Sequence, residues 1–222
     1  MATKEERDAK NRNEARTYYG LTMGGMFIAL GVLGLAAITL HALWAPGAEA
    51  EVAPSPQLAA VAAANTAPID QHPTHLSIPA IGVDASIEEL GVTTGDRMAM
   101  PSSFSTVGWY KYGPVPGASG TAVLYGHLDN GLGLSGVFKK LADLKVGDKI
   151  STTDGSGGTH TFVVDSTTSY PYQSVPAEAL LGTEGDTGSH LNLITCNGHW
   201  TYDSAMGMTY DHRLVISAHL ES

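Results

Sequence analysis

Seven short segments after residue 74 combine β-favouring residues with turn residues at their ends. They are residues 75–79, 83–90, 121–125, 149–153, 159–165, 191–196 and 213–220. Stretches rich in Gly, Asp and Pro separate them, and residues 154–158 are typical of a hairpin loop. Short helices are expected only over 137–144 and over 176–181, and Pro176 begins the second of these. Seven or eight strands at this spacing predict an all-β fold, a closed or nearly closed β-barrel with short helices.

The N-terminal part has a different pattern, with no Asp, Glu, Lys or Arg from residue 17 to residue 48. Its apolar stretch of about 25 residues would form roughly 37 Å of helix, enough for a hydrocarbon core of about 30 Å. We therefore expect one transmembrane anchor over 17–45. Segment 1–16 carries five basic residues, and the first Lys or Arg after the anchor is Arg97. The positive-inside bias predicts a cytoplasmic segment 1–16 and an extracytoplasmic remainder.

A cleaved signal peptide is the alternative interpretation of this stretch. Ala48-Glu49-Ala50 has the small-x-small form of a cleavage site, although the apolar stretch is longer than the usual h-region of about 7–15 residues. Both interpretations export the rest of the chain. Residues 46–73 are rich in Ala and Pro and predict an extended tether, and residues 74–222 have the length of one domain.

Charge and cysteine content narrow the function further. The chain has 12 basic and 22 acidic residues, and removing the five and four of segment 1–16 leaves 7 against 18. Such an acidic domain argues against a nucleic-acid partner. The one cysteine cannot form an internal disulfide, so it is a buried inert residue, an intermolecular link or a reactive thiol.

Three residues at strand ends have the chemistry of acyl transfer through a thiol. Cys196 closes the apolar run 191–196 before an expected turn at Asn197-Gly198, His127 follows the segment 121–125, and Arg213 heads the last segment. A thiolate is a strong nucleophile, a histidine carries protons, and a guanidinium stabilises an oxyanion. Thr195 is a candidate for substrate binding through its backbone or hydroxyl, with an ordinary β-former as the alternative.

Two other interpretations remain open on the residues alone. Cys196-x-x-His199 has half-site spacing for zinc, with His212 and His127 as further ligands, although a second Cys pair or a compact His cluster is missing. Alternatively, the domain binds a wall component without catalysis and Cys196 is a small buried hydrophobe. We favour the thiol site, without a metal or cofactor.

The run Leu193-Ile-Thr-Cys196 resembles the TLxTC signature of the sortases, which are membrane-anchored bacterial cysteine transpeptidases. Residues 78–92, 108–120, 126–129 and 137–148 and the strand of Arg213 are also similar to sortases, in the same order, and most similar to the actinobacterial class F. Asn192 departs from the family pattern, which often has Thr there.

The resemblance covers residues 74–222. It implies that Cys196, His127 and Arg213 cleave an LPxTG-like sorting signal between Thr and Gly through a thioacyl intermediate. It also implies that an amine of a peptidoglycan precursor resolves this intermediate.

Overall fold

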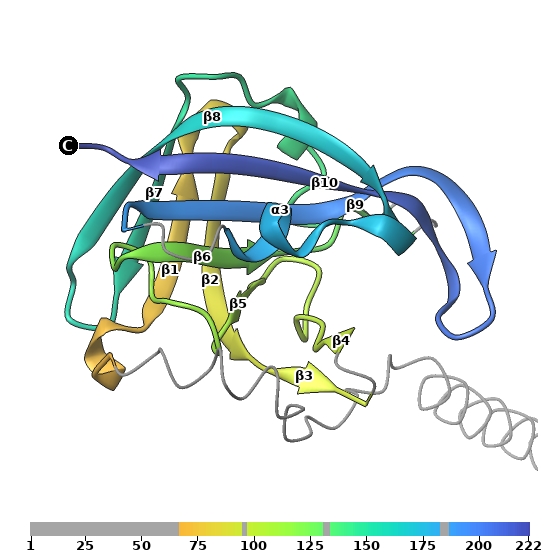
Figure 1. Ribbon diagram of the computed structural model, residues 1–222, viewed down its shortest axis with the longest axis horizontal. Coiled ribbons are helices and arrows are strands. Elements are labelled where there is room, and N and C mark those ends of the chain that lie inside the picture. Colours follow the sequence, from red (N-terminus) through yellow and green to blue (C-terminus); the bar gives the residue numbers. More distant parts are fainter. Residues whose placement is uncertain (1–66, 95–96, 131–133, 183–186) are drawn as a thin grey trace, which may run out of the picture. The chain divides into compact units, whose positions relative to one another are not determined.

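A computed structural model describes residues 67–94, 97–130, 134–182 and 187–222 of the chain (Figure 1). The expected cytoplasmic segment 1–16, the expected anchor 17–45 and residues 46–66 of the expected tether lie outside these ranges. Those three assignments therefore stay predictions. Within the described ranges, no helix is both long enough and apolar enough to cross a bilayer.

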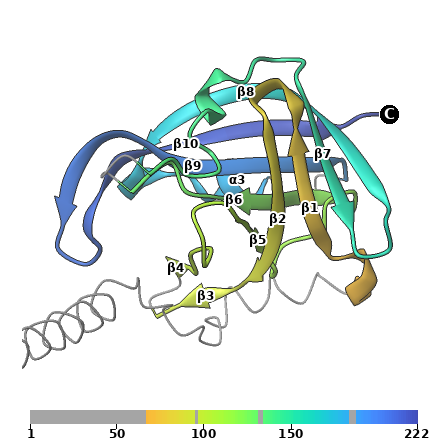
Figure 2. The same ribbon diagram turned by 180° about the vertical axis from the view of Figure 1, so that it is seen from behind.

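The strands of the described part form a closed β-barrel, as the sequence predicted (Figures 1 and 2). Around the barrel the order is β1-β2-β5-β6-β9-β10-β8-β7, and β3 with β4 forms a separate two-stranded ribbon. The strand bounds are β1 Pro73–Ile78, β2 Val83–Leu90, β3 Val92–Thr93, β4 Arg97–Met98, β5 Val107–Tyr110, β6 Gly120–Tyr125, β7 Lys149–Asp154, β8 Thr159–Pro171, β9 Ser189–Asp203 and β10 Gly207–Leu220.

The helices are short. They are the 3-10 helices η1 Ile69–Gln71, η2 Pro79–Ile81, η3 Leu141–Asp143 and η4 Tyr172–Ser174 and the α-helix α3 Ala177–Leu181. The helix expected over 176–181 is thus confirmed as α3. The prediction of a helix over 137–144 is wrong except for η3. This stretch has hydrogen bonds between residues i and i+3, such as that from the Lys139 N–H to the Gly136 carbonyl, and these do not form an α-helix.

All seven predicted segments lie in strands except for Pro79, which begins η2, but the end of the 191–196 segment was predicted wrongly. Strand β9 does not stop at Asn197-Gly198; it continues to Asp203 and forms a long hairpin with β10, which extends past the neighbouring strands (Figure 1). Gly198 has a φ of 87° and lies at a register shift between the two strands. A glycine in this conformation forms a β-bulge, so the ladder absorbs the residue that suggested a turn.

Residues 191–195 of strand β9 are buried on both faces, which explains the unbroken apolar run there. Leu191 and Leu193 belong to the cluster that fills the barrel, together with Trp109 and Phe162. Ile194 belongs to a second cluster with residues including Val123, Tyr125 and Val215. Successive side chains of a strand point to opposite faces, so the second cluster lies on the other side of β6, β9 and β10. This outer side is the one from which Cys196 projects.

Asn192 attaches helix α3 to this outer side of the sheet. Its buried side-chain amide donates two hydrogen bonds of 2.9 Å, to the carbonyls of Ala179 and Leu180. Carbonyls in the last turn of a helix lack partners within the helix, and Asn192 supplies them. The departure from the usual Thr therefore has a structural role in this chain.

Replacing Asn192 tests this attachment. We expect Asn192→Ala to lower the free energy of unfolding by about 1–3 kcal/mol, because two part-buried carbonyls lose their donor. Asn192→Asp should destabilise more, because a carboxylate would face two carbonyl oxygens. The measurement is urea unfolding followed by tryptophan fluorescence. As a control, Asn197→Ala removes an exposed bond to Ser169 and should cost no more than about 0.5 kcal/mol. Equal stability of the two alanine variants would contradict the role of Asn192.

Candidate active site

Cys196 and Arg213 face each other across the β9–β10 ladder. They are direct partners in the antiparallel register, next to the pairs Thr195 with Leu214 and Ile194 with Val215. Residues directly opposite in such a ladder place their side chains on the same face, close together. The ladder therefore brings the thiol and the guanidinium, 17 positions apart in the sequence, to neighbouring places on the outer face.

His127 reaches the other side of Cys196 through strand β6. This strand runs parallel to β9, and its last register pair is Tyr125 with Ile194. The Gly126 N–H donates to the Ile194 carbonyl at 3.1 Å, and the Thr195 hydroxyl donates to the Gly126 carbonyl at 2.8 Å. His127 is the next residue after Gly126, in the loop that follows β6, as Cys196 is the next residue after Thr195 in β9. His127 just after β6, Cys196 on β9 and Arg213 on β10 thus belong to three adjacent segments, and these three positions are called the row.

The imidazole of His127 is partly buried and packed by the segment that precedes β5. Its ring centroid lies 4.4 Å from that of Phe104, and a ring nitrogen is hydrogen-bonded to the Pro101 backbone. Burial lowers the pKa of His127, and the bond to Pro101 opposes this only in part. The ring is therefore neutral at pH 7. Because one ring nitrogen donates to a carbonyl, the other is left to accept a proton.

The guanidinium of Arg213 is held by its own strand and by one aromatic ring. Its Nη1 donates to the carbonyls of Tyr210 and His212, both at 2.9 Å, and its Nη2 donates to the Thr209 hydroxyl at 3.2 Å. Its Cζ lies 5.4 Å from the ring centroid of Tyr172. An arginine has five N–H donors, so these bonds fix the group and leave donors for an oxyanion.

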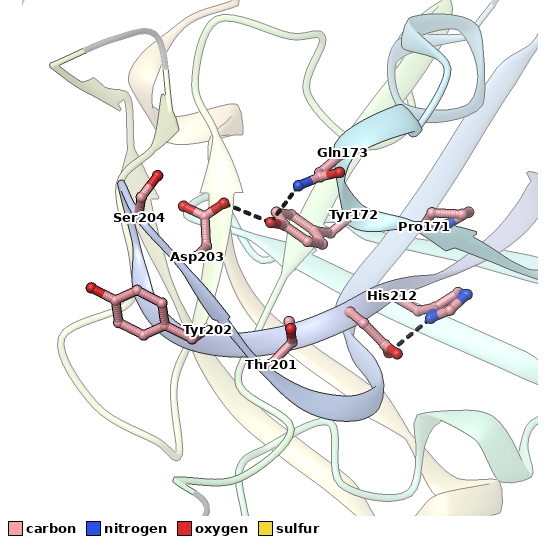
Figure 3. Close-up of a pocket in the computed structure, with 9 residues that line it drawn as sticks. Pro171, Tyr172, Gln173, Thr201, Tyr202, Asp203, Ser204 and His212 are labelled. Carbon is pink, nitrogen blue, oxygen red and sulfur yellow. Dashed lines mark hydrogen bonds and ion pairs between the residues drawn. The ribbon is translucent and has the colours of Figure 1, made fainter.

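The supporting tyrosine is itself fixed. The Tyr172 hydroxyl donates to Asp203 at 2.6 Å and accepts from the Gln173 amide at 2.8 Å, as the dashed lines in Figure 3 show. These residues line a hollow of about 620 Å³ between η4 and the β9–β10 hairpin. The β8–β9 connection is thereby tied to the hairpin that carries Arg213.

The thiol of Cys196 is protonated at neutral pH. Burial raises the pKa of Cys196 above its ordinary value, and the Asp129 carboxylate raises it further, while the Arg213 guanidinium lowers it. Burial dominates, so the pKa is raised overall. With a neutral His127 beside it, the resting site is a thiol and an imidazole rather than a preformed ion pair.

A groove of about 470 Å³ leads to the thiol. Cys196 and Arg213 form its polar end, and much of the remaining wall is apolar, including Met98, Met100 and Met206. Met100 and Met206 are exposed at its rim. Methionine is flexible and adapts to apolar ligands, so the groove suits an extended peptide with apolar side chains.

The structure bears on two other sequence hypotheses. The Thr195 hydroxyl is bonded to the Gly126 carbonyl, so it joins β9 to the histidine strand, and contact with substrate stays a prediction for this residue. The zinc hypothesis required His199 and His212 as ligands, and both instead contact Asp211. Among the described residues, no group of three His, Cys, Asp or Glu side chains could hold a metal ion.

Several residues around the site were not selected from the sequence. Phe104 packs the imidazole, Tyr172 lies under the guanidinium, and the three methionines line the groove. None has a sequence signal of its own, because each acts through a contact made by distant segments. Asp129 could have been selected from the sequence, because it lies two positions after His127 in the motif 126–129.

A family model described as "Sortase domain" matches residues 76–221. Solved structures with a similar fold include a sortase C from Streptococcus agalactiae, with 22% identity and a TM-score of 0.50 over 67% of each chain. A sortase C from Streptococcus pneumoniae has 23% identity and a TM-score of 0.50 over 67% of this chain and 66% of that one.

Sortase A from Corynebacterium diphtheriae has 23% identity and a TM-score of 0.49 over 68% of this chain. The match spans 61% of that corynebacterial chain. No curated protein matches the sequence. At these identities the structural likeness concerns the fold.

The ionisation of the site predicts how Cys196 alkylation depends on pH. Alkylation requires the thiolate, and burial raises the pKa of the Cys196 thiol. The alkylation rate should therefore rise with pH, with a midpoint above about 8.5, the pKa of a free thiol. The measurement is the rate of reaction with iodoacetamide from pH 5 to 10, which is unambiguous because the chain has one cysteine. His127→Ala should leave the midpoint nearly unchanged. A rate that is flat between pH 5 and 8 would instead indicate a stable thiolate–imidazolium pair.

Proposed function

The chain belongs to the sortase family, and on that premise we propose that it is a cysteine transpeptidase that cleaves an LPxTG-like sorting signal. The observation that carries the proposal is the row, with Cys196 and Arg213 paired on β9 and β10 at the polar end of a groove and His127 directly after the adjacent strand β6. A nucleophile, a proton carrier and a fixed cation in one row are the groups that acyl transfer requires.

In the first step, the Cys196 sulfur attacks the carbonyl carbon of the signal's threonine. The C–S bond forms and the carbonyl oxygen becomes an oxyanion, which the remaining N–H donors of Arg213 stabilise. His127, protonated in the reactive form, gives its proton to the departing glycine nitrogen as the C–N bond breaks. The product is a thioester on Cys196 and a free amine.

In the second step, an amine of a cell-wall precursor attacks the thioester. His127 takes a proton from the attacking amine, the C–S bond breaks, and Cys196 returns to its thiol form after protonation. The sorted protein is then joined to the precursor by an amide bond. Because the resting thiol and imidazole are neutral, only a minority of molecules hold the reactive ion pair, and slow turnover follows.

The groove supports a sorting signal as substrate. Its methionines offer contact to the apolar side chains of Leu and Pro, and its polar end holds the thiol where the scissile carbonyl would lie. The volume of about 470 Å³ lies within the usual range of about 300–1,000 Å³ for ligand sites.

The location and subclass complete the proposal. An anchor over 17–45 with a cytoplasmic segment 1–16 and a tether over 46–73 would hold the catalytic domain, 74–222, outside the membrane near the cell wall. The motifs of residues 78–92 and 108–120 favour class F within the family. Protease protection of the full-length chain in right-side-out vesicles tests the orientation.

The nucleophile is tested by Cys196→Ala. We expect loss of both peptide cleavage and amine transfer, because no other side chain of the sequence carries a thiol. The measurement is mass analysis of products from the full-length chain with a library of LPxTG-type peptides and amine acceptors. Ser204→Ala, an equally small change in the exposed turn of the hairpin, should retain activity. More than trace turnover by Cys196→Ala would refute the cysteine mechanism.

The oxyanion role is tested by Arg213→Lys. A lysine keeps the charge but loses the planar fork that is held by Thr209, Tyr210 and His212, so we expect kcat to fall by about 10²–10³-fold with little change in thermal stability. Arg97→Lys makes the same exchange elsewhere on the groove wall and should lower kcat far less. Wild-type kcat in Arg213→Lys would assign the oxyanion to another donor.

A further inference from the structure

The loop that follows His127 returns tightly to the same residue. The Phe138 N–H donates to the His127 carbonyl at 3.0 Å, and the Gly136 N–H donates to the Leu128 carbonyl at 2.8 Å. A side chain at position 136 would collide with the His127 carbonyl, so the close approach requires glycine there. The backbone of His127 therefore moves together with its loop.

The carboxylate of Asp129 connects this loop to the β9–β10 hairpin. Its Oδ1 accepts a hydrogen bond of 2.7 Å from the Tyr210 hydroxyl, and its Oδ2 pairs with the Lys139 ammonium at 2.6 Å. The Asp129 side chain is only 11% exposed, and Tyr210 is buried. A buried hydrogen bond to a charged acceptor is stronger than an exposed one between neutral groups.

Tyr210 is well placed to transmit this attachment to the site. Its backbone carbonyl accepts a hydrogen bond from Arg213 Nη1. Its ring packs on that of Trp200 in β9, at 4.6 Å between centroids, and its hydroxyl is hydrogen-bonded to the Trp200 side chain. Tyr210 thus contacts Asp129 of the histidine loop, Arg213 of β10 and Trp200 of β9.

The histidine is consequently held from two sides. Before it, Gly126 is bonded to Ile194 and Thr195 of β9. After it, Asp129 is bonded to Tyr210 of β10. His127 lies between these two attachments, while Cys196 and Arg213 lie on the two strands to which they lead.

We infer that Asp129 and Tyr210 are positioning residues, whose hydrogen bond holds the His127 imidazole in place relative to Cys196 and Arg213 for proton transfer. The inference rests on the proposed transpeptidase reaction. The hydroxyl–carboxylate bond closes the link between the histidine loop and the hairpin, and neither residue reacts with substrate. Proton transfer requires separations near 3 Å, and a displacement of about 1 Å costs about a hundredfold in rate.

The experiment compares Tyr210→Phe with Tyr202→Phe in the full-length chain. Tyr210→Phe removes only the hydroxyl that bonds to Asp129. Tyr202→Phe removes a hydroxyl from the same hairpin, where the ring is exposed. We expect Tyr210→Phe to lower kcat by about 10–100-fold with KM changed less than about twofold, since the groove is intact. Tyr202→Phe should behave as wild type, and both variants should remain folded by circular dichroism.

The second readout does not depend on the peptide reaction. The ring signals of His127 in an NMR spectrum, assigned with His127→Gln, should shift in Tyr210→Phe and stay in place in Tyr202→Phe. If wild type turns over peptides and Tyr210→Phe matches its kcat, the inference is overturned. If wild type turns over no peptide, the proposed function fails, and identical His127 signals in the two variants would overturn the positioning role independently.

Asp129→Asn separates position from charge. The amide keeps an oxygen that can accept the Tyr210 bond but removes the negative charge. We expect a smaller loss of kcat than in Tyr210→Phe, together with an alkylation midpoint of Cys196 shifted to lower pH. A larger loss of kcat in Asp129→Asn than in Tyr210→Phe would overturn the role of the hydrogen bond.

Discussion

Strand β9 pairs with β6 on one side and β10 on the other, and the rest of the site depends on this double pairing. The parallel ladder ends at Tyr125 and Ile194, two residues before His127 and Cys196, and the antiparallel ladder places Arg213 opposite Cys196. A shift of either ladder by one residue would separate the row, and a slip of β9 would turn Cys196 towards the barrel interior. The two hydrophobic clusters on opposite faces of β9 oppose such a slip, because each takes alternate side chains of the same strand.

The burial that fixes the register also determines the chemistry of the site. Cys196 directly follows the buried stretch 191–195 of β9, and both Cys196 and His127 are partly desolvated, which favours the neutral forms of both. Arg213 offsets part of this effect for the thiol, and Asp129 acts in the opposite direction. The fold therefore stabilises a resting site of low reactivity, in which the reactive ion pair is reached by proton movement rather than held permanently.

The barrel supplies the row, whereas segments outside the barrel orient its members. The extended hairpin provides the contacts of Arg213, η4 provides the tyrosine beneath it, and the loop after His127 carries Asp129. The family match covers the barrel and these connections alike, from residue 76 to residue 221.

The sequence alone determined the all-β class, seven of the barrel strands, and the candidates Cys196, His127 and Arg213. Local propensity, residue chemistry and the resemblance suffice for these, because all three can be read along the chain without knowing which residues are in contact. Tertiary structure decided the rest. The extension of β9 past Gly198 depends on a bulge opposite β10, and four-residue β5 is a strand because its neighbours pair with it. Phe104, Tyr172 and Tyr210 join the site through contacts between segments far apart in the chain, and no local pattern encodes a contact that only the folded chain creates.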